Sequence, residues 1–138
     1  MYSKKVIVAL DNNNLQKSLE LVKILKQDVF AFKLGYEFFF NFGLIGYKKI
    51  YSLCPKIFLD LKLHDIPNTV KKGLNALVKI KPILTTVHIS GGDEMMIASQ
   101  VKSKKTKILG VSILTSLDEK QTKKYYNQQK VSSLVKKF

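Results

Sequence analysis

The sequence predicts an α/β fold in which helices pack against a parallel β-sheet. Strand-like and helix-like segments alternate along all 138 residues, with a new strand roughly every 25 residues, which is typical of parallel sheets. The strand-like segments are almost continuously apolar, as expected when both faces of a sheet are covered. Polar side chains gather where those segments end, at the edge where open parallel sheets and (β/α)₈ barrels alike bind ligands. The alternation by itself therefore leaves both architectures open.

The first half of the chain predicts three strands and two helices. Residues 5–10, 29–34 and 57–63 are short apolar runs rich in β-branched or aromatic side chains. Between the first two runs, apolar residues recur at helical spacing across residues 15–26. The aromatic-rich residues 36–53 predict a second helix with a break at its two glycines.

The second half continues the same alternation. Pro67 stands where the first position of a helix is expected, and apolar residues at helical spacing follow as far as Val78. Strands are predicted at residues 83–89 and 107–114. Three further helices are predicted, around residues 95–101, from Leu117 or Asp118 onward, and across residues 131–138. No G-x-G-x-x-G follows the first strand, which disfavours a dinucleotide-binding fold.

The composition predicts a single globular domain over residues 1–138. Hydrophobic residues make up 46% of the chain and are spread over its whole length. No apolar run approaches the roughly 18 residues of a membrane span, and the start of the chain lacks the apolar core of a secretory signal. We therefore expect a cytoplasmic protein with no membrane partner. The single cysteine, Cys54, excludes an internal disulfide and a multi-cysteine metal site, and it is predicted to be a buried small apolar residue.

The strong positive charge raises nucleic acid as a partner, but the type of basic residue argues against it. The formal net charge is +14, and all 24 basic residues are lysines. Base recognition and bidentate phosphate contacts favour arginine, and the lysines are scattered rather than gathered into one stripe. We expect no nucleic-acid partner, and a non-catalytic basic binding fragment remains as an alternative.

The segment from Phe58 to Thr69 carries the strongest functional signal. Alternate side chains of a strand share a face, so Asp60 and Lys62 are predicted to point the same way. The intervening leucines, Leu59, Leu61 and Leu63, are predicted to point the other way and to pack under a helix. Opposite charges held rigidly at a strand end are either solvated or used in chemistry. A solvated surface ion pair is therefore the alternative to a catalytic one.

This segment resembles a known family signature. The run Asp60-x-Lys62-x-x-Asp65-Ile66-Pro67-Asn68-Thr69 is similar to that of the orotidine 5′-phosphate decarboxylases. Supporting segments occur in the expected order, at residues 8–11, 32–35, 87–92 and 114–116. The D-x-K-x-x-D pattern is shared with sugar-phosphate decarboxylases and hexulose-phosphate synthase, which remain the enzymatic alternatives. The continuation from Ile66 to Thr69 favours the nucleotide decarboxylases.

The resemblance implies a (β/α)₈ barrel and a cofactor-independent reaction in pyrimidine biosynthesis. Family members convert orotidine 5′-phosphate to uridine 5′-phosphate and CO₂ without a metal or an organic cofactor. Loss of CO₂ leaves negative charge at C6 of the pyrimidine. By similarity, Lys62 stabilises that charge and donates the proton, while Asp60 lies next to the substrate carboxylate. Lys33, Asp60, Lys62 and Asp65 are expected to form a catalytic row of alternating charges.

The resemblance also implies the substrate contacts and a homodimer across the catalytic face. Asp65 and Thr69 are expected to enter the site of the partner subunit. The expected substrate-binding residues are Asp11, Lys33, Asp60, Lys62, Asp65, Ile66, Thr69, Thr115 and Ser116. In this set Asp11 and Lys33 bind ribose hydroxyls, Ile66 packs near the base, and Thr115 and Ser116 belong to the segment that contacts the pyrimidine. His88 is expected to support the site or to touch the substrate, and His64 is expected to face away and not to be catalytic.

Each of these residues also has an ordinary structural interpretation. Asp11 is equally a loop residue before a helix, and Lys33 a solvated lysine at a strand end. Asp65 lies just before a helix, where its charge complements the helix dipole. Thr115 and Ser116 are of the types that cap the helix that follows them.

The sequence departs from the family in length. Full (β/α)₈ barrels have roughly 250 residues, whereas this chain predicts about five βα units, so we expect the N-terminal portion of a barrel without strands six to eight. The family's phosphate site, which includes an arginine beyond the later strands, is expected to be absent. We expect such a portion to fold poorly, because its first and fifth strands become exposed edges. We also expect weak activity or none, because the binding energy of the substrate phosphate, which normally helps to lower the barrier at the reacting centre, would be missing.

Overall fold

The computed structural model, which describes residues 5–127 and 130–138, contains one parallel sheet whose strands follow the order β1-β2-β3-β4-β5. The strands are β1 (Ile7–Ala9), β2 (Ala31–Leu34), β3 (Ile57–Leu63), β4 (Leu84–His88) and β5 (Lys107–Val111). Every strand pairs in parallel with the strand before it. The sheet is therefore a run of βα units laid side by side in chain order, as in the wall of a barrel.

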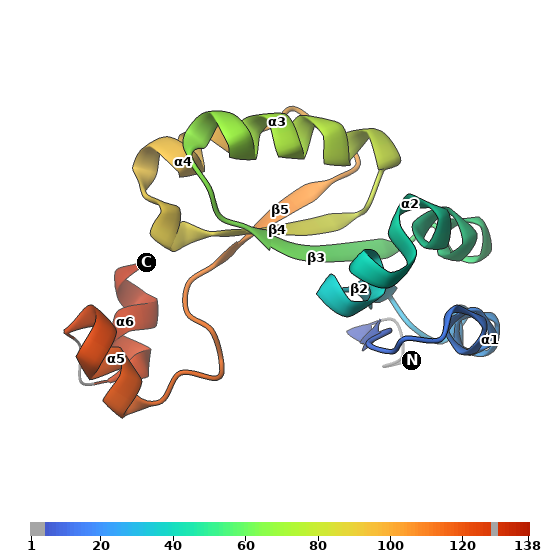
Figure 1. Ribbon diagram of the computed structural model, residues 1–138, viewed down its shortest axis with the longest axis horizontal. Coiled ribbons are helices and arrows are strands. Elements are labelled where there is room, and N and C mark those ends of the chain that lie inside the picture. The colour runs from blue at the N-terminus through green and yellow to red at the C-terminus, as the bar shows by residue number, and fades with distance from the viewer. Residues whose placement is uncertain (1–4, 128–129) are drawn as a thin grey trace.

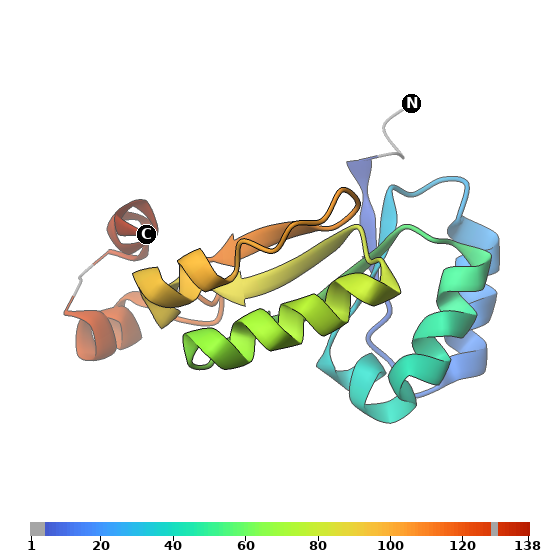
Figure 2. The same cartoon turned by 90° about the horizontal axis from the view of Figure 1, so that it is seen from above.

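The helices lie along one side of this curved sheet, and the last two stand apart from it. The α-helices are α1 (Leu15–Leu25), α2 (Tyr36–Leu53), α3 (Pro67–Leu77), α4 (Asp93–Ala98), α5 (Glu119–Tyr126) and α6 (Val131–Lys137), with short 3₁₀ turns η2 (Val78–Ile80) and η3 (Ile89–Gly91). Figure 1 shows α1 to α4 on the outer side of the sheet, and α5 with α6 at the end of the loop that leaves β5. The view from above shows the same separation (Figure 2).

All five predicted strands are present, although most are shorter than their apolar runs. The first strand covers Ile7–Ala9 rather than residues 5–10, because only these residues pair with β2. The fifth ends at Val111 rather than at residue 114, because its pairing with β4 ends at His88. The expected α/β architecture is therefore confirmed. Each strand ends where its pairing with the neighbouring strand ends.

The predicted helices are also present, with shifted ends. α4 begins at Asp93 and ends at Ala98, earlier than the predicted residues 95–101. α5 begins at Glu119 because Asp118 caps it: the Asp118 carboxylate accepts the Gln121 amide (2.8 Å), and the Gln121 side chain accepts the Asp118 amide (3.1 Å). The structural alternative for Thr115 and Ser116, that they cap this helix, is therefore wrong.

The predicted break in α2 occurs at the first of its two glycines. Gly43 has φ +53° and ψ −148°, a conformation that glycine adopts without steric cost. Gly46, the second glycine, stays within the helix and is buried beside Phe38 and Phe42. The kink folds the aromatic first half of the helix over this second glycine.

The core lies between the sheet and its helices and consists of two clusters. The larger joins β1, β2 and β3 to α1 and α2, and its fully buried members include Phe32, Phe38 and Ile50. Cys54 belongs to it, which confirms the predicted buried cysteine. The smaller cluster joins β4 to α3 and α4 through Val70, Leu74, Val87 and Met95. Over residues 5–127 and 130–138, no helix is both long and apolar enough to cross a membrane.

Candidate active site

Four charged side chains meet at the carboxyl ends of β1, β2 and β3. The Lys33 ammonium lies 3.5 Å from Asp11 Oδ2 and 3.7 Å from Asp60 Oδ2. The Lys62 ammonium lies 2.8 Å from the same Asp60 oxygen. The structure thus brings these residues into one alternating series, Asp11–Lys33–Asp60–Lys62, which we call the charged row. Both lysine side chains stay partly exposed, at 26% and 30%, so a small molecule can reach their ammonium groups.

The row differs from the expected one at its ends. Asp65 was placed in it by sequence, but it is exposed, and its Oδ1 accepts the backbone amide of Ile66 (2.7 Å). Among the residues that the structure describes, no ion pair involves Asp65. The reason is that β3 ends at Leu63 and the chain then turns toward α3. Asp11 extends the row at its opposite end, beside Lys33.

Asp60 is the centre of the row and is only 7% exposed. Its Oδ2 faces the two lysines, and its Oδ1 accepts a hydrogen bond from the Thr86 hydroxyl (2.9 Å). Burial alone would raise the pKa of Asp60. Hydrogen bonds from Lys62 and Thr86, together with the charges of Lys62 and Lys33, outweigh burial and hold that pKa below its usual value.

The backbone at Lys62 departs from a regular strand. Lys62 has φ +42°, which is unusual for a residue other than glycine. Residues Leu59 and Leu63 of β3 pair with Thr85 and Val87 of β4, so the longer stretch of β3 bulges away from its partner. Such outliers persist only where their surroundings hold them.

Two hydroxyl groups hold this bulge in place. The Lys62 amide donates to Thr86 Oγ1 (2.9 Å), and the Tyr36 hydroxyl donates to the Leu61 carbonyl (2.8 Å). The leucines beside the bulge line a hollow of about 390 Å³ together with residues of α2 and α3, as predicted for the helix-facing side: Leu59, Leu61, Leu63, Gly73 and Ala76 are among them. Despite the bulge, the leucines of β3 face the helices as predicted, and Asp60 and Lys62 face the charged row.

Sequence reasoning missed Thr86 and Tyr36. Threonine is common in strands for its β-branched shape alone, so nothing in the β4 segment distinguished Thr86. Tyr36 begins α2 and reaches a carbonyl 25 positions further along the chain. Both contacts depend on how strands and helices align in space, which local patterns do not encode.

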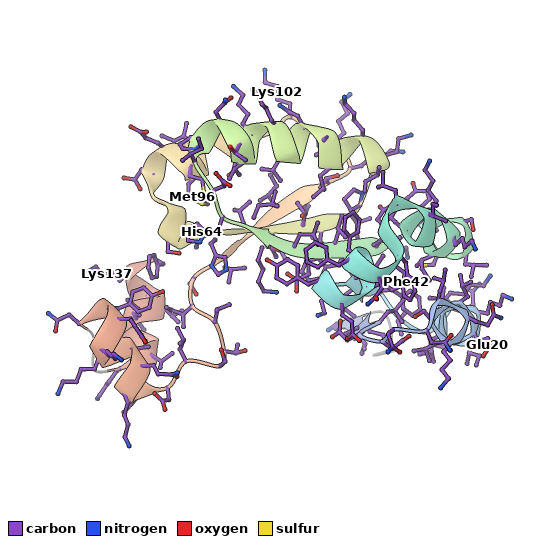
Figure 3. The ribbon with its side chains drawn as sticks, in the orientation of Figure 1. Glu20, Phe42, His64, Met96, Lys102 and Lys137 are labelled. Carbon is purple, nitrogen blue, oxygen red and sulfur yellow. The ribbon has the colours of Figure 1, made fainter. Side chains whose placement is uncertain are left out.

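His88 ends β4 beside His64, with the two ring centres 5.2 Å apart. Burial, then the charges of His64 and Lys62, lower the pKa of His88. In Figure 3 His64 lies below the end of β3, and its ring is close to Gly91. Among the described residues, no hydrogen bond or ion pair links His64 to Asp60 or Lys62.

The other predicted site residues lie outside the charged row. Ile66 is 66% exposed, and Thr69 is exposed in the first turn of α3. With Asp65 they form one exposed segment at the start of that helix. Thr115 and Ser116 are exposed in the loop between β5 and α5, which Figure 1 shows leading away from the sheet.

The two lysines of the row, Lys33 and Lys62, offer ammonium groups to an anionic group of a substrate. Within the described part of the chain, no three His, Cys, Asp or Glu side chains gather in a way that could hold a metal ion. The row offers two ammonium groups beside a buried carboxylate. A fixed ammonium of this kind can stabilise negative charge that develops on a bound molecule and can give it a proton.

The two lowered pKa values predict a stability that falls on acidification. For Asp60 the stabilisation is complete above its unfolded pKa of about 3.9 and is lost as the pH falls through its lower folded pKa. For His88 the folded state favours the neutral ring, so stability declines once the pH falls below about 6.5. The free energy of unfolding, measured with urea between about pH 3 and pH 8, should therefore fall in two steps as the pH is lowered. Asp60→Asn should abolish the lower one and His88→Gln the upper one, and an unchanged profile in either variant would contradict its assignment.

Known proteins resemble this chain in sequence and in fold. Residues 4–137 match the family described as "Orotidine 5'-phosphate decarboxylase / HUMPS family". The chain is 44% identical over 138 residues to the orotidine 5′-phosphate decarboxylase of Ligilactobacillus salivarius, covering 94% of this chain and 57% of that protein. It is 42% identical over 125 residues to that of Ehrlichia chaffeensis, covering 89% and 54%. The chain thus spans about half the length of the curated relatives it matches.

The fold comparison agrees. The crystal structure of orotidine 5′-phosphate decarboxylase from Lactobacillus acidophilus superposes with a TM-score of 0.82 at 36% identity. The superposition covers 96% of this chain and 63% of that one. Together with the strand order, this confirms the expected incomplete (β/α)₈ barrel.

Proposed function

Because the chain belongs to the orotidine 5′-phosphate decarboxylase / HUMPS family, we propose that it carries the catalytic charges of an orotidine 5′-phosphate decarboxylase. The observation that supports this most directly is the Lys62 ammonium held 2.8 Å from the Asp60 carboxylate at the end of β3. The reaction would convert orotidine 5′-phosphate to uridine 5′-phosphate and CO₂. Its place would be in pyrimidine biosynthesis, as the resemblance to the family implies.

In this proposal Lys62 does the chemistry. The bond between C6 and the carboxylate breaks, CO₂ leaves, and the electron pair stays on C6. The Lys62 ammonium stabilises that charge as it develops and then gives C6 its proton. The proposal needs no metal or organic cofactor, because this one group supplies both the charge and the proton.

Asp60 and Lys33 would prepare the site for the substrate. The buried Asp60 carboxylate orients Lys62 and lies where the substrate carboxylate would approach, so like charges would oppose each other before CO₂ leaves. Lys33, held between Asp11 and Asp60, would bind ribose hydroxyls together with Asp11. The row would thus bind the sugar at one end and react at the other.

The exposed residues at the start of α3 would serve a second copy of the chain. Asp65, Ile66 and Thr69 are exposed at one short segment and have no partner in the charged row. We propose that they reach into the site of the partner subunit in a homodimer. Thr115 and Ser116, on the loop after β5, would close over the pyrimidine.

A substrate comparison tests the proposed function. The 138-residue chain is incubated with orotidine 5′-phosphate or with a hexulose phosphate, and release of CO₂ or of aldehyde is followed. Formation of uridine 5′-phosphate, in the presence of a metal chelator, would support the proposal. Preferential cleavage of the hexulose phosphate would favour the sugar-phosphate branch of the superfamily. Because the 138-residue chain is expected to be weakly active or inactive without the phosphate site, the comparison is repeated with the barrel completed by the C-terminal part of the Ligilactobacillus salivarius relative. Turnover of neither substrate by the completed barrel would favour a non-catalytic fragment.

A further inference from the structure

We propose that Thr86 is the positioning residue of this site: its one hydroxyl group holds both the backbone of Lys62 and the carboxylate of Asp60. The inference rests on the proposed function for its catalytic meaning, but its geometry stands on the contacts themselves. Thr86 is 4% exposed and lies in the middle of β4.

The two hydrogen bonds of Thr86 have a fixed direction. Its Oγ1 accepts the Lys62 amide at 2.9 Å, and it lies 2.9 Å from Asp60 Oδ1. A hydroxyl has one hydrogen, and the ionised carboxylate can only accept. The hydrogen therefore points to Asp60, and a chain of donors runs from the Lys62 amide through the hydroxyl to the carboxylate. Bonds in such chains strengthen one another.

The first consequence concerns the orientation of the carboxylate. Thr86 engages Oδ1 of Asp60, which leaves Oδ2 for Lys62 at 2.8 Å and for Lys33 at 3.7 Å. The two oxygens thus have separate partners on opposite sides. Without the hydroxyl, the carboxylate is free to rotate and the position of the Lys62 ammonium is no longer defined by it.

The second consequence concerns the strained backbone. The bulge removes the Lys62 amide from the regular ladder between β3 and β4, and a buried amide without a partner is costly. The Thr86 hydroxyl takes the place of the missing ladder carbonyl. It thereby holds Lys62 at φ +42°, the conformation that carries its side chain to Asp60.

Threonine suits this position because its side chain is stiff. A β-branched residue has few accessible χ1 rotamers in a packed strand, so burial of the methyl group fixes where the hydroxyl points. Serine keeps the hydroxyl but loses the methyl group, and valine keeps the shape but loses the hydroxyl.

The neighbouring residue, Thr85, provides a matched control. Thr85 is also buried in β4, but its Oγ1 has no hydrogen-bond partner within residues 5–127 and 130–138. Thr85→Val and Thr86→Val therefore remove the same group from neighbouring buried positions. Only the second removes a hydrogen bond.

The experiment is a carboxyl titration of the 138-residue chain by ¹³C NMR, with the Asp60 signal assigned through Asp60→Asn. Thr86→Val is expected to raise the pKa of Asp60 toward its ordinary value of about 3.9, Thr86→Ser to restore most of the lowering, and Thr85→Val to change nothing. An Asp60 titration in Thr86→Val equal to that of the unsubstituted chain would overturn the proposal. A chain without a dispersed spectrum would also overturn it, because no positioned site would exist.

Two further readouts keep the outcomes separable. If the chain decarboxylates orotidine 5′-phosphate, Thr86→Val should lower kcat about 10- to 100-fold with a smaller change in KM, as expected for loss of one hydrogen bond to a charged group. If it does not, the proposed function fails while the titration still decides the role of Thr86. If Thr86→Val does not fold, amide exchange in the unsubstituted chain decides: slow exchange at Lys62 supports the proposal, and exchange as fast as at the exposed His64 overturns it.

Discussion

Replacing Lys62 by alanine is expected to lower the rate of orotidine 5′-phosphate decarboxylation about 10³-fold or more, with little effect on substrate binding. In the proposed reaction its ammonium stabilises charge that exists only as CO₂ leaves, and interactions of that kind act on kcat rather than on KM. Lys33, the other lysine of the row, is not expected to replace it, because its ammonium is shared between Asp11 and Asp60. Steady-state rates and substrate affinity, measured separately, check the prediction.

The control for this experiment is a lysine of equal charge elsewhere. Lys49 is exposed on α2, so Lys49→Ala removes one positive charge without touching the row and should leave the rate unchanged. The variant Lys62→Gly distinguishes inactivity caused by loss of the ammonium from inactivity caused by misfolding. Glycine tolerates the positive φ of this position, so this variant should be as inactive as Lys62→Ala while its backbone is relieved of strain. Activity within tenfold of the unsubstituted chain in either Lys62 variant would exclude it as the proton donor.

Gly46→Ala is expected to destabilise the fold by about 2–3 kcal/mol, although alanine is the better helix former. A Cβ at Gly46 would clash with Phe42 Cβ and would lie 3.4 Å from Phe38 Cε1. Phe42 Cβ is attached directly to the backbone, so relief requires the kink at Gly43 to shift. For a domain of this size, thermal unfolding should move down by roughly 10 °C.

Gly73 is the matched control on another helix. A Cβ there would lie 3.8 Å from Leu63 Cδ1, an ordinary contact, so Gly73→Ala in α3 should stabilise the fold by about 0.5–1 kcal/mol. The two identical substitutions are thus expected to have opposite signs. Equal effects of the two substitutions on the free energy of unfolding would contradict the prediction, because they would show that the fold accommodates a Cβ at Gly46 without cost.

The sequence was sufficient to predict the strands, the helices between them and the edge where the charges gather. These features follow from local patterns: apolar runs of strand length, apolar residues at helical spacing, and the rule that parallel strands end at one edge. Asp11, Lys33, Asp60 and Lys62 came together for that reason, since each lies within or shortly after one of three neighbouring strands. The ends of β1 and β5 were misjudged because pairing, not composition, decides where a strand stops.

The bulge at Lys62 could not be predicted in this way. Regular alternation already places Asp60 and Lys62 on one face, so nothing in the pattern signals an irregular backbone. A positive φ at a lysine has no counterpart in residue preferences. The hydroxyls that hold the bulge come from β4 and from α2, and their positions depend on register and packing.

The charged row also has a consequence for the order in which the molecule takes shape. Asp60 is joined to Thr86 across 26 positions of sequence, the Lys62 amide to the same hydroxyl across 24, and the Leu61 carbonyl to Tyr36 across 25. No local segment can make any of these bonds, and pairings so distant in the chain form slowly. During synthesis, Asp60 and Lys62 leave the ribosome well before the strand that fixes them. The Lys62 backbone therefore acquires its final geometry only after β4 has paired with β3.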